Sequence, residues 1–473
     1  MEVRLTIIQT LKKEIVPLKS RIWVSAADGA TATLNGLVTG GILTYYFTRW
    51  RGLEGDMAAL VWLLFGIWNA VNDPLFGFIS DRTKNKLGRR IPYIRYGAPI
   101  YSLAFICLWI NWGGQSTSQM GLFFQLLFFL FVFDTLYTAI ATSIYIMPFE
   151  MAISNKARSS ILIWKILFNV FATAIPLILG PIILPGPGEE AASFRIIMIS
   201  MGLAMGAIVF ISTFYYKEKH FIQEEEQFPF FKSLIACFKN PSFLVFESIS
   251  FTIIYVQTGL MQGVLYYFDE IKIPGIPIYL ALAAGIVIGV LLWLNRRDKW
   301  GVKTSMQVMT AMFAAGCFIM LFGGRLLPFA MFSFFLVGTG FAGGMYLIPL
   351  MNGDVIDMDE HKTGLRREGM YAGINSFITK PAISLAQAAF LQILVWYGYD
   401  QTLAKGLQNT NAQTGILTAW MLIPGILLFA CTLILSLYPL HGKEWENIKN
   451  AIAKSHQEKE KKYLMDQGIQ WVD

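Results

Sequence analysis

The sequence predicts an all-α membrane protein with twelve transmembrane helices, arranged as two pseudo-symmetric halves of six. The composition is strongly apolar, the apolar residues fall into long runs, and most charged residues lie between these runs. Apolar residues make up 55% of the 473-residue chain and charged residues only 15%, whereas a soluble domain carries roughly 25% charged residues. Each membrane crossing needs about 20 mostly apolar residues, so a chain of this length has room for a dozen crossings with short connections.

Long apolar runs are found on both sides of one polar interval. Their length predicts helices, because the strands of a membrane barrel alternate over only about ten residues. Six runs lie at about 22–48, 57–79, 92–112, 119–147, 160–184 and 193–216, and six more at about 242–268, 275–295, 304–324, 326–350, 371–398 and 413–438.

The composition divides the chain into four parts. Residues 1–216 are predicted to form the first six-helix bundle and residues 242–438 the second. The polar segment 217–241 is the expected cytoplasmic connection between them. The charged segment 439–473 is the expected cytoplasmic tail, for which we predict a solvated helix.

The distribution of basic residues predicts that both termini are cytoplasmic. Lys and Arg concentrate in the N-terminal tail, in alternate loops and in the C-terminal tail, and such an excess marks the cytoplasmic side of a membrane. The opposite side holds only Arg49, Arg51, Arg195, Lys272, Arg325 and Lys405. We therefore expect a multi-pass protein of the plasma (inner) membrane. This dispersed placement also argues against a nucleic-acid partner, despite the net charge of +7.

Similar charged loops follow the second run and the eighth run. In each loop an acid and cations come before a glycine and further cations, and such internal repeats are typical of transporters whose halves move against each other. Charged residues in these loops are predicted to form a latch that breaks when the halves move. The predicted latch residues are Gly77, Asp81, Arg82, Arg89, Arg90 and Asp298, with Glu150 and Arg158 at the inner ends of the fourth and fifth helices.

These motifs resemble those of a known transporter family. The loop after Gly77 resembles the signature between helices two and three of the major facilitator superfamily, with a two-residue insertion. The segment 72–77, Asn-Asp-Pro-Leu-Phe-Gly, is similar to a motif of the glycoside–pentoside–hexuronide:cation symporters, the melibiose permease group. The segment 363–369, with Lys380 eleven residues further on, and the first helix with Asp28 are similar as well. The resemblance implies a major facilitator fold, and gating salt bridges that involve Arg366, Arg367 and Glu368.

Ionisable residues inside the apolar runs are the strongest functional candidates, because each is costly in hydrocarbon unless it is paired or hydrated. Asp73 and Asn69 are four residues apart and share one helix face, and their oxygens suit a hard cation such as sodium. Alternatively, Asp73 carries a proton. Lys380 is the expected counter-charge, which an arriving cation displaces; a static ion pair between helices is the other interpretation. Asp134 and Glu247 also lie in runs and are assigned no role.

Asp28 and Lys165 form the second candidate pair. By resemblance, the family binds sugar hydroxyls with an acid in helix one and a basic residue in helix five. Lys165 stands where melibiose permease has Arg, so bidentate geometry is lost. Asn69 replaces a second acid of that family, and segment 139–143 lacks its helix-four acid, which leaves sodium and proton open as coupling ions.

Other side chains are predicted to line the solute site. Aromatic rings suit sugar stacking, although bundle packing is the commoner role of any one ring. Gln257, Thr258 and Gln262 are interpreted as one face of helix seven, with inter-helix hydrogen bonding as the alternative. The predicted lining residues are Trp68, Tyr145, Trp164, Gln257, Gln262 and Asn375.

The sequence features distinguish three function classes. A symporter that couples a glycoside-type solute to sodium or protons explains the repeated halves and the charges within the membrane. A lysolipid carrier of the same family is the second candidate. An enzyme is not expected, because the four histidines lie in loops or the tail and no catalytic constellation stands at membrane depth. The acids of segment 354–361 are interpreted as gating groups rather than a metal site. We expect no cofactor besides the coupling ion, the lipid bilayer as surroundings, and a monomer.

Overall fold

The computed structural model describes residues 15–81, 83, 85–114, 117–152, 155–184, 191–218, 237–271, 273–364 and 368–466, and in some helical stretches it describes the backbone alone. The described residues form helices joined by short connections, with no β-strand among them. The first group comprises α1 (Leu18–Thr39), α2 (Ile42–Tyr45), the π-helical segment η2 (Tyr46–Trp50), α3 (Gly55–Asp81), α4 (Ile91–Trp109), α5 (Gln119–Met151), α6 (Asn155–Ile183) and α7 (Ala192–Ser212).

The second group follows after residue 237. It comprises α9 (Pro241–Glu270), α10 (Gly275–Gly323), α11 (Leu327–Thr363), α12 (Glu368–Trp396), α13 (Thr410–Leu417), the π-helical segment η3 (Thr418–Leu422), α14 (Ile423–Ile434) and the 3-10 segment η4 (Leu435–Leu437). Helix α15 (Gly442–Asp466) ends the described chain.

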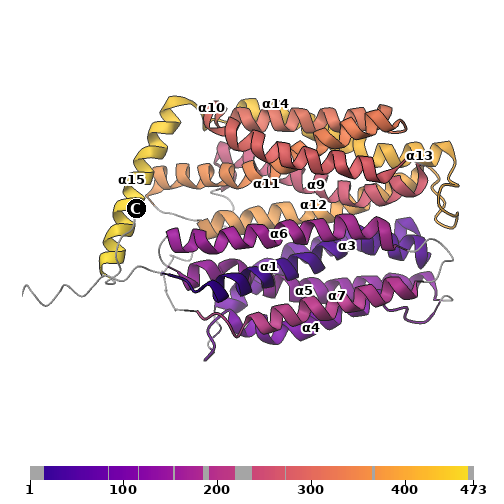
Figure 1. The fold of residues 1–473 in the computed structure, drawn as a ribbon, viewed down its shortest axis with the longest axis horizontal. Coiled ribbons are helices and arrows are strands. Elements are labelled where there is room, and N and C mark those ends of the chain that lie inside the picture. The colour runs from indigo at the N-terminus through magenta and orange to yellow at the C-terminus, as the bar shows by residue number, and fades with distance from the viewer. Residues whose placement is uncertain are drawn as a thin grey trace, which may run out of the picture.

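The two groups of helices lie side by side, with their helices roughly parallel (Figure 1). Helices α3 and α12 are in extensive contact along the boundary between the groups. Helix α15 crosses one end of the bundle, which we call the proximal end, and the connection between α12 and α13 lies at the other end, the distal end (Figure 1).

The helix bounds fall within a few residues of most predicted runs. Eight described helices are long and apolar enough to cross a membrane. The eighth and ninth runs are joined in α10, which is interrupted at Gly301, where φ is 74° and ψ is 168°. Glycine adopts this left-handed backbone without steric cost, so the chain breaks its helix there, within the charged segment 296–303 that was predicted as a loop.

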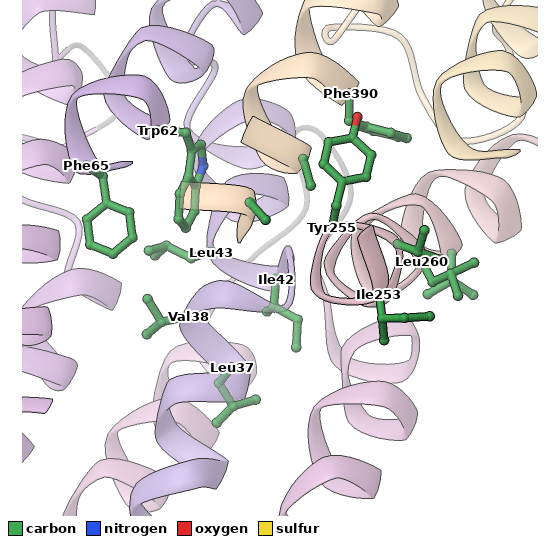
Figure 2. Packing of buried hydrophobic residues seen from close by; sticks show 14 of the residues in the cluster. Leu37, Val38, Ile42, Leu43, Trp62, Phe65, Ile253, Tyr255, Leu260 and Phe390 are labelled. Atoms are coloured by element: carbon green, nitrogen blue, oxygen red, sulfur yellow. The ribbon is translucent and has the colours of Figure 1, made fainter. Parts of the chain in front are cut away.

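Apolar side chains fill both groups and extend across the boundary between them. Figure 2 shows side chains of α1 and α2 between those of α3 and those of α9 and α12: Leu37, Val38, Ile42, Leu43, Trp62, Phe65, Ile253, Tyr255, Leu260 and Phe390. Burial of a polar group in such surroundings is costly unless it is hydrogen-bonded. The polar residues at this boundary therefore have to satisfy one another.

The first span is interrupted between α1 and α2. Gly41 has φ of 92°, and a Cβ placed on it would lie 2.6 Å from Cα of Gln262 in α9. Both the backbone conformation and the close approach require glycine here. The glycine thus lets the backbones of α9 and of the α1–α2 connection approach each other closely on the distal side of the boundary.

Candidate functional site

Asp28 of α1 and Lys165 of α6 form the predicted ion pair. Nζ of Lys165 lies 3.1 Å from Oδ1 of Asp28, and the two side chains are 10% and 20% exposed, respectively. Asn169, one turn after Lys165, donates its amide to Oδ2 of Asp28 at 2.6 Å. The ammonium also lies 5.8 Å from the ring centre of Tyr145. The structure therefore brings Asp28, Lys165 and Tyr145 together, with Asn169 as a partner that the sequence analysis missed.

A cavity of about 300 Å³ begins one helical turn further along the same helices. Residues 32, 35, 36 and 39 follow Asp28 at helical spacing on α1, and residues 172, 173 and 176 follow Lys165 on α6. Its polar lining consists of hydroxyl and amide groups from α1, α5, α6 and α9, namely Asn35, Thr39, Tyr137, Thr173, Gln257 and Thr258. Phe341 and Met345 of α11 add apolar surface. The cavity thus lies between the two groups, close to the ion pair.

Half of the predicted solute-site residues lie elsewhere among the described residues. Trp68 stacks on Phe131 with ring centres 5.1 Å apart and donates to Thr135 at 3.3 Å. Trp164 is half-buried on α6 and is not part of the cavity lining. Asn375 hydrogen-bonds with Ser250 of α9.

The assignment of Gln262 to the face of Gln257 was wrong. Five residues of α-helix turn the chain through about 500°, so the two side chains diverge by about 140°. Gln257, Thr258 and Met261 line the cavity. Gln262 is fully buried against Gly41 instead.

A second polar cluster connects α3, α5 and α12. The amide of Asn72 donates to Oδ2 of Asp134 at 3.0 Å and to Oγ1 of Thr138 at 3.1 Å. Nζ of Lys380 reaches the same Thr138 hydroxyl at 3.4 Å, from the other group of helices. We call Asn72, Asp134, Thr138 and Lys380 the boundary cluster.

The predicted pairing of Asp73 with Lys380 stays a prediction, because the side chain of Asp73 lies outside the described part of the structure. Asn69, one turn before it on α3, is buried at 3% exposure, and its Oδ1 has no hydrogen-bond partner among the described atoms. Asn72 and Asp134 were not among the predicted coupling residues. The signal for Asp134 was its spacing from Thr138, which places an acid and a hydroxyl on one face of α5.

The contacts described for Arg89, Glu150, Arg158 and Asp298 each lie within one group of helices. Nη2 of Arg89 lies 3.0 Å from Oε1 of Glu150. Glu218 accepts hydrogen bonds from the backbone N–H groups of residues 89, 90 and 91, at the start of α4, where a carboxylate is favourable. Arg158 donates to the carbonyl of Ala152, and Asp298 pairs with its neighbour Arg297.

The predicted latch between the two groups is therefore not tested. Its other members lie outside the described residues, or are described by their backbone alone: Gly77, Asp81, Arg82, Arg366, Arg367 and Glu368.

An unpredicted ion pair joins the two groups at the distal end. Nη2 of Arg49 lies 3.2 Å from Oε1 of Glu270, and both side chains are fully buried. Nη1 of Arg49 donates to the carbonyls of Gln401 and Leu403 at 3.1 and 3.0 Å. The other oxygen of Glu270 accepts the backbone N–H of Gly406 at 3.1 Å. A buried ion pair needs such additional hydrogen bonds to offset its desolvation.

A second acid reinforces this contact. Asp269 accepts a hydrogen bond from Tyr45 of α2 and lies 3.3 Å from Nζ of Lys405. We call Tyr45, Arg49, Asp269, Glu270 and Lys405 the distal lock. It fastens α2 and η2 of the first group to α9 and the α12–α13 connection of the second.

The charged tail is less solvated than predicted. Lys449 of α15 forms an ion pair with Asp354 of α11, whose side chain is 2% exposed. Trp445 and Ile452 are also buried, at 7% and 9% exposure. One face of α15 is therefore attached to the proximal end of the second group.

Comparison with known proteins gives a consistent result. Residues 26–442 match the sequence family described as MFS/sugar transport protein. The isoprimeverose transporter of Lactiplantibacillus pentosus is 23% identical over 416 residues, which are 85% of this chain and 85% of that protein. The mouse sodium-dependent lysophosphatidylcholine symporter 1 is 27% identical over 153 residues, 32% of this chain and 28% of that protein.

Among solved structures, the fold is similar to the inward-open xylose transporter XylE from E. coli. The TM-score is 0.62 at 13% sequence identity, and the match covers 90% of this chain and 98% of that one. This likeness confirms the all-helical fold of these transporters.

Proposed function

The chain belongs to the MFS/sugar transport family, a family of membrane transporters and not of enzymes, and on that premise we propose that it is a cation-coupled symporter of a sugar- or glycoside-type solute. The observation that carries this proposal is the Asp28–Lys165 pair beside a cavity between the two groups of helices, whose lining includes six amide or hydroxyl side chains. The carboxylate accepts hydrogen bonds from solute hydroxyls and the ammonium donates to them. The amide and hydroxyl groups of the cavity supply further donors and acceptors for a solute rich in hydroxyls.

The boundary cluster provides a physical basis for coupling. Lys380 belongs to the second group, whereas Asn72, Asp134 and Thr138 belong to the first. With Asp73 as the further acid, a sodium ion or a proton arriving here neutralises a carboxylate that otherwise attracts the ammonium of Lys380. Binding of the cation therefore weakens one attraction between the two groups, which links its binding to their relative movement.

We further propose twelve membrane crossings with both termini in the cytoplasm. The segments α1 to η2 form the first crossing, α10 forms two on either side of Gly301, and α13 to α14 form the last. In this orientation the distal lock lies on the outer side of the membrane, where it is closed. The structure then corresponds to a state of an alternating-access cycle that is closed on its outer side.

A lysolipid carrier is the weaker alternative. The similarity to the lysophosphatidylcholine symporter covers only a minor part of the chain, whereas the similarity to the isoprimeverose transporter covers 85% of it.

Purified protein in liposomes separates these functions. Labelled glycosides, uronates and lysolipids are offered under an imposed sodium or proton gradient, and accumulation of a sugar-type solute under one gradient is expected. Accumulation that needs neither gradient would contradict symport, and accumulation of lysolipids alone would favour the alternative.

Asp73→Asn and Lys380→Ala are each expected to abolish accumulation driven by the gradient, because either change removes one of the two charges that respond to the cation. Exchange of labelled for unlabelled solute should persist, since the solute site is intact. Lys443→Ala, an exposed change on α15, is the matched control and should accumulate solute normally. Full accumulation in both variants would reduce the pair to a structural contact.

Asp134→Asn is expected to raise the cation concentration that half-activates transport about tenfold or more, because the loss of one cation contact costs about 1.4 kcal/mol or more. The affinity for solute should change little at saturating cation. Unchanged cation activation would place the coupling site elsewhere.

A further inference from the structure

Glu247 is a buried acid in α9 that the proposed solute and coupling sites do not use. It lies in the second turn of the helix that begins at Pro241, and it is 5% exposed. Among the residues whose side chains the structure describes, no Lys, Arg or His forms an ion pair with it. An isolated buried carboxylate is very costly, and such a group binds a proton instead.

Asn375 of α12 supplies a polar partner for both the protonated and the deprotonated form of Glu247. With its amide nitrogen turned toward Glu247, it donates to the two carboxylate oxygens at 3.2 and 3.3 Å and to Oγ of Ser250 at 3.1 Å. With its carbonyl oxygen turned the same way, it accepts from Ser250 at 3.1 Å and faces the carboxyl as an acceptor for its proton. An amide offers a donor and an acceptor on one rotatable group, so both protonation states can be satisfied.

Several other titratable groups on the helices around α9 have partners of their own. Tyr371 accepts from Asn240, Cys431 donates to the carbonyl of Ser248, Lys380 donates to Thr138, Lys165 pairs with Asp28, and Asp354 pairs with Lys449. On α9 itself, Asp269 and Glu270 lie at the far end in the distal lock. Glu247 and Asn375 thus form a separate unit in the second group of helices.

We propose that Glu247 and Asn375 form a proton-binding site within the second group, in which Glu247 holds a proton as a neutral acid in the conformation described here. The site is distinct from the boundary cluster, and it exists whichever cation drives transport. Asn375 lies five residues before Lys380 on α12, so a movement of this helix changes the surroundings of both groups. The proton is released to water when the carboxyl becomes hydrated.

Infrared difference spectroscopy of the full chain in lipid tests the proposal directly. Upon titration, the wild type should show the carbonyl stretch of a protonated carboxylic acid near neutral pH. Labelling of glutamate alone with ¹³C should shift this band, which separates it from aspartic acids such as Asp134. Glu247→Gln should abolish the band. Glu444→Gln, on an exposed position of α15, should keep it.

Asn375→Leu provides a second variant that leaves the acid in place. The band should remain but move in frequency, because the hydrogen bond to its carboxyl is lost. A wild type without a protonated glutamic acid band near neutral pH, a Glu247→Gln spectrum that keeps the band, or an Asn375→Leu band at the original frequency would each overturn the proposal. None of these readouts requires transport, so failure of the symport assay leaves this test intact.

Discussion

Asp28→Asn is expected to lower the affinity for solute about 100-fold, the largest effect among the changes in the solute site. The substitution leaves the ammonium of Lys165, 3.1 Å from the former carboxylate, without its counter-charge. It also removes the charged acceptor for solute hydroxyls, and a hydrogen bond to a charged group contributes about 1.5–3 kcal/mol. A loss of about 2.7 kcal/mol corresponds to about 100-fold in a dissociation constant. Binding of labelled solute to the purified variant measures the effect.

A double variant separates recognition of the solute from folding. Asp28→Asn combined with Lys165→Gln removes both charges, and we expect it to recover most of the thermal stability of the wild type while binding of solute stays weak. Asp56→Asn, an exposed acid in the first turn of α3, is the matched control. If the single variant binds solute with unchanged affinity, the solute site lies elsewhere. If the double variant regains binding, the pair serves only to hold α1 and α6 together.

Glu270→Gln is expected to open the distal end of the protein. It leaves the fully buried guanidinium of Arg49 without its counter-charge, at a cost of about 3–5 kcal/mol, which changes the ratio of closed to open states more than about 100-fold. Spin labels on Met120→Cys and Leu407→Cys, exposed positions near the distal end of each group, report the separation in a background that lacks the four native cysteines. The longer separation should become the major population.

The exposed ion pair between Arg297 and Asp298 provides the matched control. Its members are adjacent residues of one helix, and their side chains are 36% and 68% exposed. Exposed pairs contribute about 0–1 kcal/mol, so Arg297→Gln should leave the distance distribution unchanged. If Glu270→Gln lowers the melting temperature but also leaves the distances unchanged, the distal lock is a structural contact and not a gate.

The helices were predictable because each membrane crossing needs its own apolar run. The bounds of these runs were less reliable where a buried charge lies inside a helical segment. Arg49 was taken as the start of a loop, but it continues the first span in η2 and is fully buried. Its partner Glu270 is 221 residues away in the chain. The sequence contains no signal for a pairing of this separation.

The Asp28–Lys165 ion pair was predictable for a different reason. Asp28 and Lys165 are two of the few opposite charges within the runs, and a membrane interior forces such charges together. Asp134 was equally visible but was left without a role, because the family resemblance places its acid at another position on the helix. The contacts of Asn72 and Lys380 around Thr138 identify its place only in three dimensions.

The break at Gly40 and Gly41 divides the first span into an inner part, α1, and an outer part, α2 with η2. The inner part carries Asp28, which pairs with Lys165, and Asn35 and Thr39, which line the cavity, whereas the outer part carries Arg49 of the distal lock. Rotation of the backbone at the two glycines changes the angle between these two parts and leaves the hydrogen bonds within each helix in place. The cavity and the distal lock are thereby connected through one continuous segment of chain. The flexibility of the two glycines determines how far a tilt of the inner part also tilts the outer part.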